Sequence, residues 1–132
     1  MSNNAPMRPR PLSPHLLIYK PIPSMVMSIV HRITGMVLYG GMGVVALWLL
    51  AMASSEDSAD LFSELFGSII GLVVLFLFSW VLFHHMLGGI RHLIWDFGYM
   101  LSREQSRKTS AALPVASLAV TVICWLIAWL LV

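Results

Sequence analysis

The sequence FHHMLGGIRHLIWD, residues 83–96, follows an apolar run from Leu65 to Leu82 and contains three histidines, one arginine and one aspartate. The apolar run is typical of a membrane-spanning helix, because about 20 apolar residues are needed to cross the hydrocarbon core. Ionisable side chains within or at the end of such a helix are costly to bury and usually have a function and a partner. This stretch therefore indicates both a membrane protein and the segment in which its function is concentrated.

Helical spacing places several of these residues on one face. At about 100° per residue, one stripe contains His85, Gly88, Gly89, His92 and Asp96. Imidazoles on both sides of a glycine notch favour a flat ligand close to the backbone, and haem is the obvious candidate because imidazole often binds haem iron. The stripe fits equally well two helices that pack through small residues, with the histidines as interhelical hydrogen-bonding groups.

The composition excludes several classes of protein. Of the 132 residues, 58% are hydrophobic and 11% are charged, whereas an ordinary soluble domain has roughly 25% charged residues. The single cysteine, Cys124, excludes an intrachain disulfide and any zinc or iron–sulfur site built from cysteines of this chain alone. Because no Cys-x-x-Cys-His occurs, a haem here would be non-covalent and b-type. The net charge of +2 gives no indication of nucleic-acid binding.

Three apolar runs predict an all-α membrane protein with transmembrane helices at about residues 25–53, 65–93 and 111–132. We expect a cytoplasmic or interfacial segment over residues 1–23 and one transmembrane domain over residues 24–132. The acidic stretch 54–64 and the polar stretch 100–110 are expected to be loops. The third helix is almost wholly apolar, with Pro114 near its expected start, where proline is tolerated.

A second polar cluster occurs in the early turns of the first predicted helix. Ser28, His31 and Arg32 share one face at helical spacing. A hydroxyl, an imidazole and a guanidinium together suit an anionic or carbonyl-bearing ligand. The alternative is that Arg32 extends to the lipid headgroups while His31 joins a polar contact between helices.

The basic residues orient the predicted bundle. The loop between the first two predicted helices has no Lys or Arg. The basic residues lie before or early in the first helix, or at or after the end of the second: Arg8, Arg10, Lys20, Arg32, Arg91, Arg103, Arg107 and Lys108. The positive-inside rule therefore places the N-terminus and the second loop in the cytoplasm or the matrix, and the C-terminus outside. Both polar clusters then lie at the same depth, in the inner half of the membrane, which favours a functional reading of both.

The depth of His85 makes it the best metal ligand in the chain. It lies six residues before Arg91, roughly 9 Å deeper in the membrane at 1.5 Å per residue. His84 points about 100° away from His85, so the two adjacent histidines cannot serve the same face. An electron-transfer haem generally needs two axial ligands and this chain offers one, so we infer a partner membrane subunit that provides the second.

Two further ionisable residues lie near the inner edge. His92 is close enough to water to bind a haem propionate or lipid headgroups. Asp96 shares its stripe and is expected to pair with Arg32 or Arg91.

Three segments resemble the cytochrome b subunits of succinate dehydrogenase, which are membrane anchors of respiratory complex II. They are RPLSPHL at residues 10–16, SIVHRITG at residues 28–35 and the stretch from His85 through GIRH at residues 89–92 to Trp95-Asp96. The segments occur in the expected order, and the third predicted helix is similar only in position and hydrophobicity.

The resemblance implies one half of a heterodimeric helical anchor, paired with a second small three-helix subunit. The implied pair holds an iron–sulfur subunit and a flavoprotein. Succinate is then oxidised in the flavoprotein, and the anchor helps to pass electrons from the iron–sulfur subunit to ubiquinone. It also implies that His85 is an axial ligand of haem b, that Ser28 and Arg32 serve the quinone site, and that His31 and Arg32 lie near the haem propionates. Arg91 and Asp96 are candidate supporting residues, and Asp96 is expected to hold Arg32 or join a proton path.

Two other functions remain possible from the sequence: a purely structural anchor without haem, and a small transporter subunit with a polar pathway along its whole depth. The chain is not expected to be an enzyme on its own. With no clear transit peptide, we expect a bacterial inner membrane in preference to the mitochondrial inner membrane.

The predicted orientation is testable with reporter fusions. A reporter joined after Lys108 is expected to show a cytoplasmic location, because every Lys and Arg then falls on the inner side. A reporter joined at the C-terminus is the control and is expected outside. Activity of a periplasmic reporter after Lys108 would reverse the assignment.

Overall fold

In the computed structural model, which describes residues 20–131, the chain forms four helices. They are α1 (Pro23–Ser54), α2 (Glu56–Gly67), α3 (Ile69–Asp96) and α4 (Arg103–Leu131). Helices α1, α3 and α4 are long and apolar enough to cross a membrane. The prediction of an all-α protein with three membrane-spanning helices is therefore confirmed. Most of the predicted segment 1–23, the sequence RPLSPHL at residues 10–16 and Val132 lie outside the described residues.

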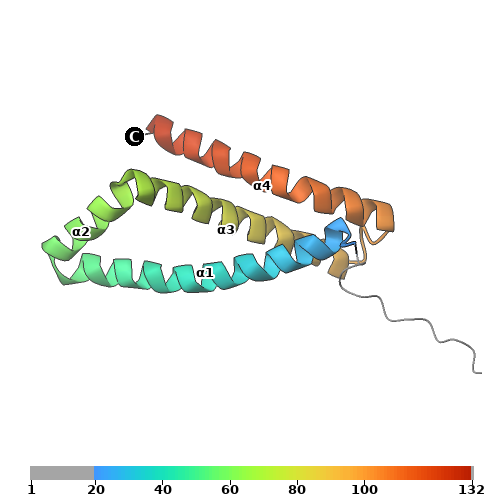
Figure 1. The fold of residues 1–132 in the computed structure, drawn as a ribbon, viewed down its shortest axis with the longest axis horizontal. Helices are drawn as coiled ribbons and strands as arrows, with labels where there is room; N and C mark the ends of the chain where they lie inside the picture. Colours follow the sequence, from blue (N-terminus) through green and yellow to red (C-terminus); the bar gives the residue numbers. More distant parts are fainter. Residues whose placement is uncertain (1–19, 132) are drawn as a thin grey trace, which may run out of the picture.

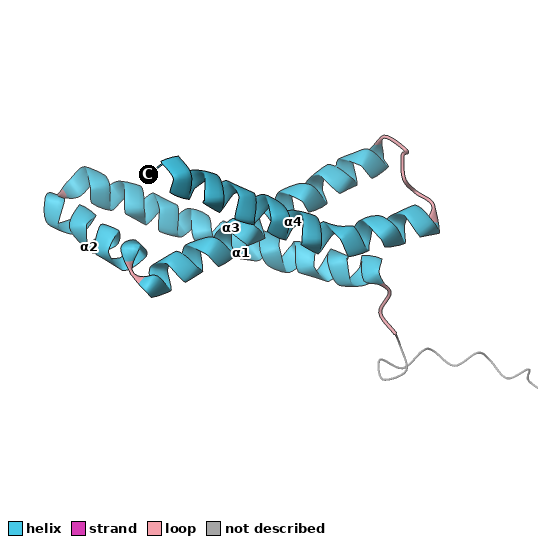
Figure 2. Cartoon of the chain, turned by 90° about the horizontal axis from the view of Figure 1, so that it is seen from above, coloured by secondary structure: helices cyan, strands magenta, loops and turns pink. Residues whose placement is uncertain are grey.

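The three long helices alternate in direction, and α3 lies between α1 and α4 (Figure 1). The start of α1, the end of α3 and the start of α4 come together at one end of the molecule, which we call the inner end. At the opposite, outer end α1 and α3 move apart, and α2 connects them (Figure 1). Figure 2 shows that the long helices cross one another at an angle instead of running parallel. The close packing is therefore nearer the inner end, where both polar clusters of the sequence lie.

The acidic stretch 54–64 was predicted to be a loop, and this prediction is wrong because α2 begins at Glu56. Ser55 caps the helix, since its side chain accepts a hydrogen bond from the Ser58 backbone N–H at 3.2 Å. Glu56 and Asp57 in the first turn complement the positive end of the helix dipole. The polar composition of this stretch indicated a loop, although the stretch forms a short amphipathic helix.

The apolar face of α2 covers the space between α1 and α3. The rings of Phe62 and Phe66 lie one turn apart with centroids separated by 5.9 Å. They line a cavity of about 410 Å³ together with apolar residues from α1 and α3, among them Trp48 and Phe78. The partial burial of these two rings against α1 and α3 holds a helix with four carboxylates at the outer end.

The second spanning helix starts at Ile69 and not at Leu65 as predicted, because Ser68 interrupts the chain in an extended conformation. The Ser68 hydroxyl then caps α3 by accepting a hydrogen bond from the Gly71 backbone N–H at 3.0 Å. A Cβ at Gly71 would collide with the backbone of residues 65–66. The tight corner between α2 and α3 therefore requires glycine at position 71.

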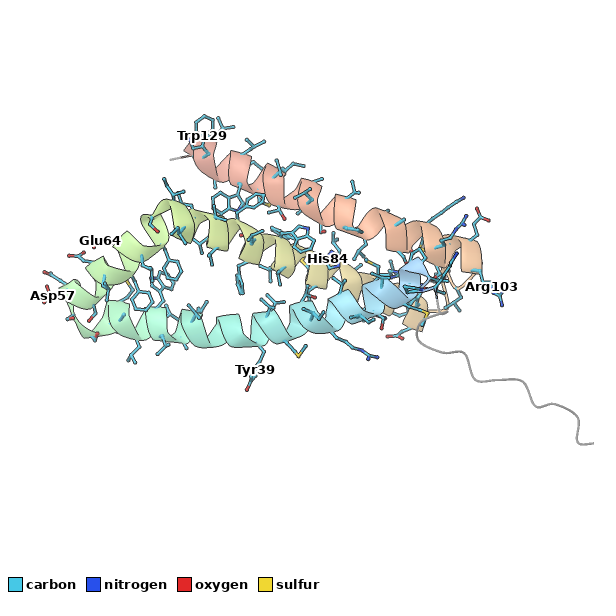
Figure 3. All side chains as sticks on the ribbon, viewed as in Figure 1. Tyr39, Asp57, Glu64, His84, Arg103 and Trp129 are labelled. Atoms are coloured by element: carbon cyan, nitrogen blue, oxygen red, sulfur yellow. The ribbon has the colours of Figure 1, made fainter. Side chains whose placement is uncertain are left out.

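The polar stretch 100–110 was also predicted to be a loop, but α4 begins at Arg103. Ser102 caps this helix, because its hydroxyl accepts a hydrogen bond from the Gln105 backbone N–H at 3.3 Å and donates one to Gln105 Oε1 at 3.0 Å. Consequently Pro114 lies inside α4 and not near its start. Figure 3 shows Arg103 at the inner end, and Asp57 and Glu64 at the outer end.

The side chains enclosed between the helices are mostly polar, and the outward faces are apolar. Two hydrophobic residues of the described part are buried, Ala51 and Leu113, whereas six polar or charged residues are: Thr34, His84, Arg91, Ser110, Ser117 and Thr121. Small hydroxyl residues let helix backbones approach closely, which is how membrane helices pack when lipid surrounds them. The bundle is thus built for an apolar surrounding, with its hydrogen-bonding groups inside.

Candidate functional site

The centre of the site is a pair of stacked imidazoles from α1 and α3. The rings of His31 and His85 have centroids 4.0 Å apart and lie within 15° of parallel. Each ring lies against a glycine of the other helix. His85 Cε1 is 3.0 Å from the position that a Cβ would take at Gly35, and a Cβ at Gly88 would collide with the His31 ring. The two helices therefore interlock by reciprocal insertion of histidine against glycine.

Hydrogen bonds to backbone carbonyls fix both rings. His85 Nδ1–H donates to the His31 carbonyl at 3.1 Å, and His31 Nε2–H donates to the His85 carbonyl at 3.2 Å. The Thr34 hydroxyl also donates to the His31 carbonyl at 2.9 Å and lies 3.1 Å from His85 Nδ1. Because a carbonyl only accepts, the proton of His85 is on Nδ1 and the lone pair is on Nε2. Among residues 20–131, no hydrogen bond is formed by His85 Nε2.

The neighbouring His84 belongs to a different helix contact. Its side chain is 1% exposed and lies against α4, where Nδ1 is 3.2 Å from the Ser117 hydroxyl. Its ring also contacts Trp80 at a centroid distance of 5.2 Å. The structure thus places His84 and His85 on different faces of α3, as the 100° rotation per residue requires.

Arg91 is buried and turned toward α4. Its Nη2 donates to the Ser110 hydroxyl at 2.6 Å and to the Ser106 carbonyl at 3.3 Å. The guanidinium also lies 4.1 Å from the ring centroid of Trp95, an arrangement that a cation and an aromatic face favour. Within the described part of the chain, Arg91 Nε and Trp95 Nε1 are buried and have no hydrogen-bond partner.

Asp96 does not make the pairing expected from the sequence. The one ion pair within residues 20–131 joins Glu104 to Lys108, so Asp96 is bonded to neither Arg32 nor Arg91 there. Asp96 is exposed. Five residues separate it from Arg91, which turns the two side chains about 140° apart on the same helix.

Both polar clusters line one cavity at the inner end. Its volume is about 510 Å³, and its walls come from α1, α3 and α4. Eight of its lining residues carry polar side chains: Ser24, Ser28, His31, Arg32, Arg91, His92, Trp95 and Ser106. No Asp or Glu is among the lining residues. The cavity therefore combines two guanidiniums with hydroxyl and imidazole groups, which suits an anionic or carbonyl-bearing ligand.

The predicted stripe on α3 is divided in the structure. His92 meets His31 edge to face, with centroids 5.2 Å apart, so it shares the α1 side with His85 and Gly88. Gly89 is different, since a Cβ there would have no heavy atom within 4 Å. The His31 ring occupies the space next to Gly88. This glycine therefore serves the packing of α1 against α3, which was the alternative to binding a flat ligand.

Sequence reasoning missed the polar face of α4. Ser110, Ser117 and Thr121 are at most 1% exposed and face α3. Two of them bond the ionisable residues Arg91 and His84. The signal was present in the sequence, because these hydroxyl residues are spaced seven and four residues apart and so share one helix face.

The fold and the site together define a multi-pass, all-α membrane protein with a histidine- and arginine-lined cavity at one end. Residues 7–128 match the family described as succinate dehydrogenase/fumarate reductase transmembrane subunit. The chain belongs to this family.

Individual relatives cover nearly all of the chain. The succinate dehydrogenase cytochrome b556 subunit of Paracoccus denitrificans is 38% identical over 114 residues, which cover 86% of this chain and 88% of that protein. The cytochrome b556 subunit of Rickettsia prowazekii is 37% identical over 116 residues, covering 88% and 90%. The cytochrome b560 subunit of Reclinomonas americana is 33% identical over 130 residues, covering 89% and 85%.

Adjacent glycines allow a matched test of the interlock. Gly88→Ala is expected to lower the melting temperature of the purified membrane complex, because the new methyl displaces the His31 ring, and overpacking typically costs about 1–3 kcal/mol. Gly89→Ala is the control and is expected to be neutral or slightly stabilising, since its Cβ meets nothing within 4 Å. Equal melting temperatures for the two variants would show that His31 and Gly88 do not form this contact.

Proposed function

We propose that this chain is the haem b-binding membrane anchor of a succinate:ubiquinone oxidoreductase and forms part of its quinone site. The observation that carries this proposal is the His85 imidazole, whose Nδ1–H is held by the His31 carbonyl at 3.1 Å while Nε2 keeps its lone pair. The chain acts as a subunit, and the oxidation of succinate takes place on its partners.

The residues present fit a haem iron. Histidines that bind metals usually donate the other ring N–H to a carbonyl or carboxylate, which fixes the tautomer and the ring orientation. His85 has this arrangement, and His31 and Gly35 hold the ring in place. When bound, haem supplies a one-electron redox centre. His85 is therefore the proposed axial ligand.

His84 fits the role less well. Its Nε2 also lacks a hydrogen-bond partner in the described residues, but the ring is enclosed between α3 and α4 and is 1% exposed. The ring of a porphyrin could not reach this nitrogen without separating the two helices. The choice of His85 over His84 therefore rests on access as well as on the family pattern.

The second axial ligand is proposed to come from a partner. The family pattern assigns one iron ligand to this chain, so a second small three-helix anchor would supply the other. An iron–sulfur subunit and a flavoprotein would bind at the inner end, where the basic residues gather.

The cations of the cavity suit the haem propionates. Arg32 and Arg91 line it without any Asp or Glu, together with His31 and His92. Arg91 is bonded to hydroxyl and carbonyl groups and to no carboxylate within residues 20–131. We propose that Arg32 and His92 bind the propionates, that His31 lies beside them with its Nε2–H held by the His85 carbonyl, and that Arg91 supports them through the charge of its guanidinium.

Ser28 and Arg32 are the proposed quinone-binding residues. They lie one helical turn apart on α1 and both line the cavity. Both are also exposed in the isolated chain, as expected for groups that reach a ligand shared with partner subunits. The Ser28 hydroxyl would donate to a quinone carbonyl, and the Arg32 guanidinium would stabilise the negative charge that develops on the oxygen.

The site would lie at the cytoplasmic side of a bacterial inner membrane. Arg91, Arg103, Arg107 and Lys108 belong to the inner end of the bundle, whereas α2 carries acidic residues and no basic ones. This asymmetry supports a cytoplasmic N-terminus. Quinone reduction consumes two protons, and a site at the inner edge would take them from cytoplasmic water.

The transporter alternative predicts a polar pathway through the whole depth of the bundle. The cavity near the outer end is lined by apolar residues from α1, α2 and α3. The hydroxyls of Ser117 and Thr121 lie deeper in the bundle but donate to carbonyls within α4 and are 0% exposed. These features support an anchor with one polar site and not a polar pathway.

The assignment of the iron ligand is testable by replacing each adjacent histidine. His85→Ala is expected to abolish or severely alter the haem b absorbance of the assembled complex, because the axial nitrogen is lost. His84→Ala is the matched control and is expected to keep the haem. If His85→Ala keeps the haem b absorbance and His84→Ala loses it, the iron ligand is His84 and not His85.

The quinone site is testable with Ser28→Ala and Arg32→Leu. Both are expected to slow quinone reduction while succinate oxidation with a soluble acceptor persists, since the dicarboxylate site lies on another subunit. Loss of a hydrogen bond to a neutral carbonyl costs ~1 kcal/mol and loss of one from a charged group ~1.5–3 kcal/mol, so Arg32→Leu is expected to be the more damaging.

Assembly of each variant complex is checked first. Arg32→Lys, and Ser54→Ala at the far end of α1, serve as controls. If the assembled Ser28→Ala and Arg32→Leu complexes both reduce quinone with wild-type rate and affinity, the quinone site lies elsewhere.

A further inference from the structure

The function proposed above leaves His84 without a role, although its side chain is among the most deeply buried of the described residues. It is 1% exposed, and its bonding partner Ser117 is 0% exposed. The two side chains join α3 to α4 near the middle of both helices, where Figure 3 shows His84 between them. His84 precedes the proposed iron ligand in sequence, so any rotation of α3 moves both side chains together.

The direction of the bond follows from the other contact of Ser117. Its hydroxyl donates to the Pro114 carbonyl at 2.9 Å, so toward His84 the oxygen acts as an acceptor. His84 therefore donates from Nδ1–H at 3.2 Å, and its lone pair is on Nε2. Within the described residues this Nε2 is buried without a partner. A buried acceptor without a donor costs free energy, so packing alone would favour an apolar residue at position 84.

A second hydrogen bond between α3 and α4 fits the same alignment of the two helices. Seven residues along α3 from His84, Arg91 donates to Ser110, which is seven residues back along α4 from Ser117. Seven residues are two helical turns, so both bonds lie on one line between antiparallel helices. A polar contact of this kind specifies one rotation and one register, which apolar packing does not do as strictly.

We propose that His84 is a positioning residue: through its bond to Ser117 it fixes the rotation of α3 and so directs His85 toward His31 and Gly35 on α1. This rests on the proposed role of His85 as the haem ligand. His84 does not touch the iron. Its loss leaves the haem bound but changes the angle at which the His85 imidazole is presented.

The test uses variants that separate the two ring nitrogens of His84. In His84→Asn the side-chain amide takes a place close to that of Nδ1 and can still donate to Ser117. In His84→Gln the amide takes a place close to that of Nε2 instead. His84→Leu and Ser117→Ala each remove the bond. Each variant is assembled into the full complex, and the haem midpoint potential and low-temperature electron paramagnetic resonance spectrum are measured.

The variants His84→Leu, His84→Gln and Ser117→Ala are expected to keep the haem. All three should shift its midpoint potential in the same direction relative to the wild type and alter its electron paramagnetic resonance spectrum. His84→Asn is expected to match the wild type, and combining His84→Leu with Ser117→Ala should add no further shift. Wild-type potential and spectrum in Ser117→Ala would overturn the proposal, and this variant decides the matter if His84→Leu fails to assemble.

A measurement independent of haem separates this proposal from the proposed function. The Phe78 ring of α3 contacts Gly41 of α1, so cysteines at positions 41 and 78 report the rotation of α3, with Cys124 replaced by serine. We expect a thiol cross-linker to join the pair efficiently and Ser117→Ala to lower the yield. Unchanged cross-linking in Ser117→Ala would contradict the positioning role. A wild-type complex without haem would contradict the proposed function alone.

Discussion

The reciprocal stacking of His31 and His85 is the contact on which the inner end of the bundle depends. Each imidazole lies over a glycine of the opposite helix, and each donates a hydrogen bond to a carbonyl there. The contact therefore sets the separation of α1 and α3 and the tautomer of both rings at once. It also brings the hydroxyl and guanidinium cluster of α1 into the same cavity as His92 and Arg91 of α3.

The distribution of polar groups follows from the surrounding solvent. In an apolar medium an unpaired polar group is costly, so hydroxyls, imidazoles and a guanidinium gather between the helices while large apolar side chains point outward. The cavity near the outer end is lined instead by apolar residues, which include the aromatic face of α2. The polar side chains of this member of the family are thus concentrated at the inner end, where the proposed haem and quinone site lies.

Much of this architecture could be predicted from hydropathy and helical spacing, but not all of it. The three spanning helices and the different faces of His84 and His85 follow from run length and the 100° rotation per residue. The extension of α4 to Arg103 and the helix α2 were missed because polar composition resembles a loop, although Ser55 and Ser102 are typical caps. The predicted pairing of Asp96 was wrong because residue spacing shows which helix face a side chain lies on but not which residue it contacts. Arg91 instead bonds to hydroxyl groups of α4, a helix that was predicted to be almost wholly apolar.

The most direct test of a haem-binding anchor is the reduced-minus-oxidised absorbance spectrum of the purified wild-type complex that contains this chain. The arrangement of His85, with Nδ1 bonded to the His31 carbonyl and Nε2 available, predicts a b-type haem band. A fully assembled complex that oxidises succinate but shows no b-type band would contradict the assignment. The stacked rings of His31 and His85 would then serve only the packing of α1 against α3.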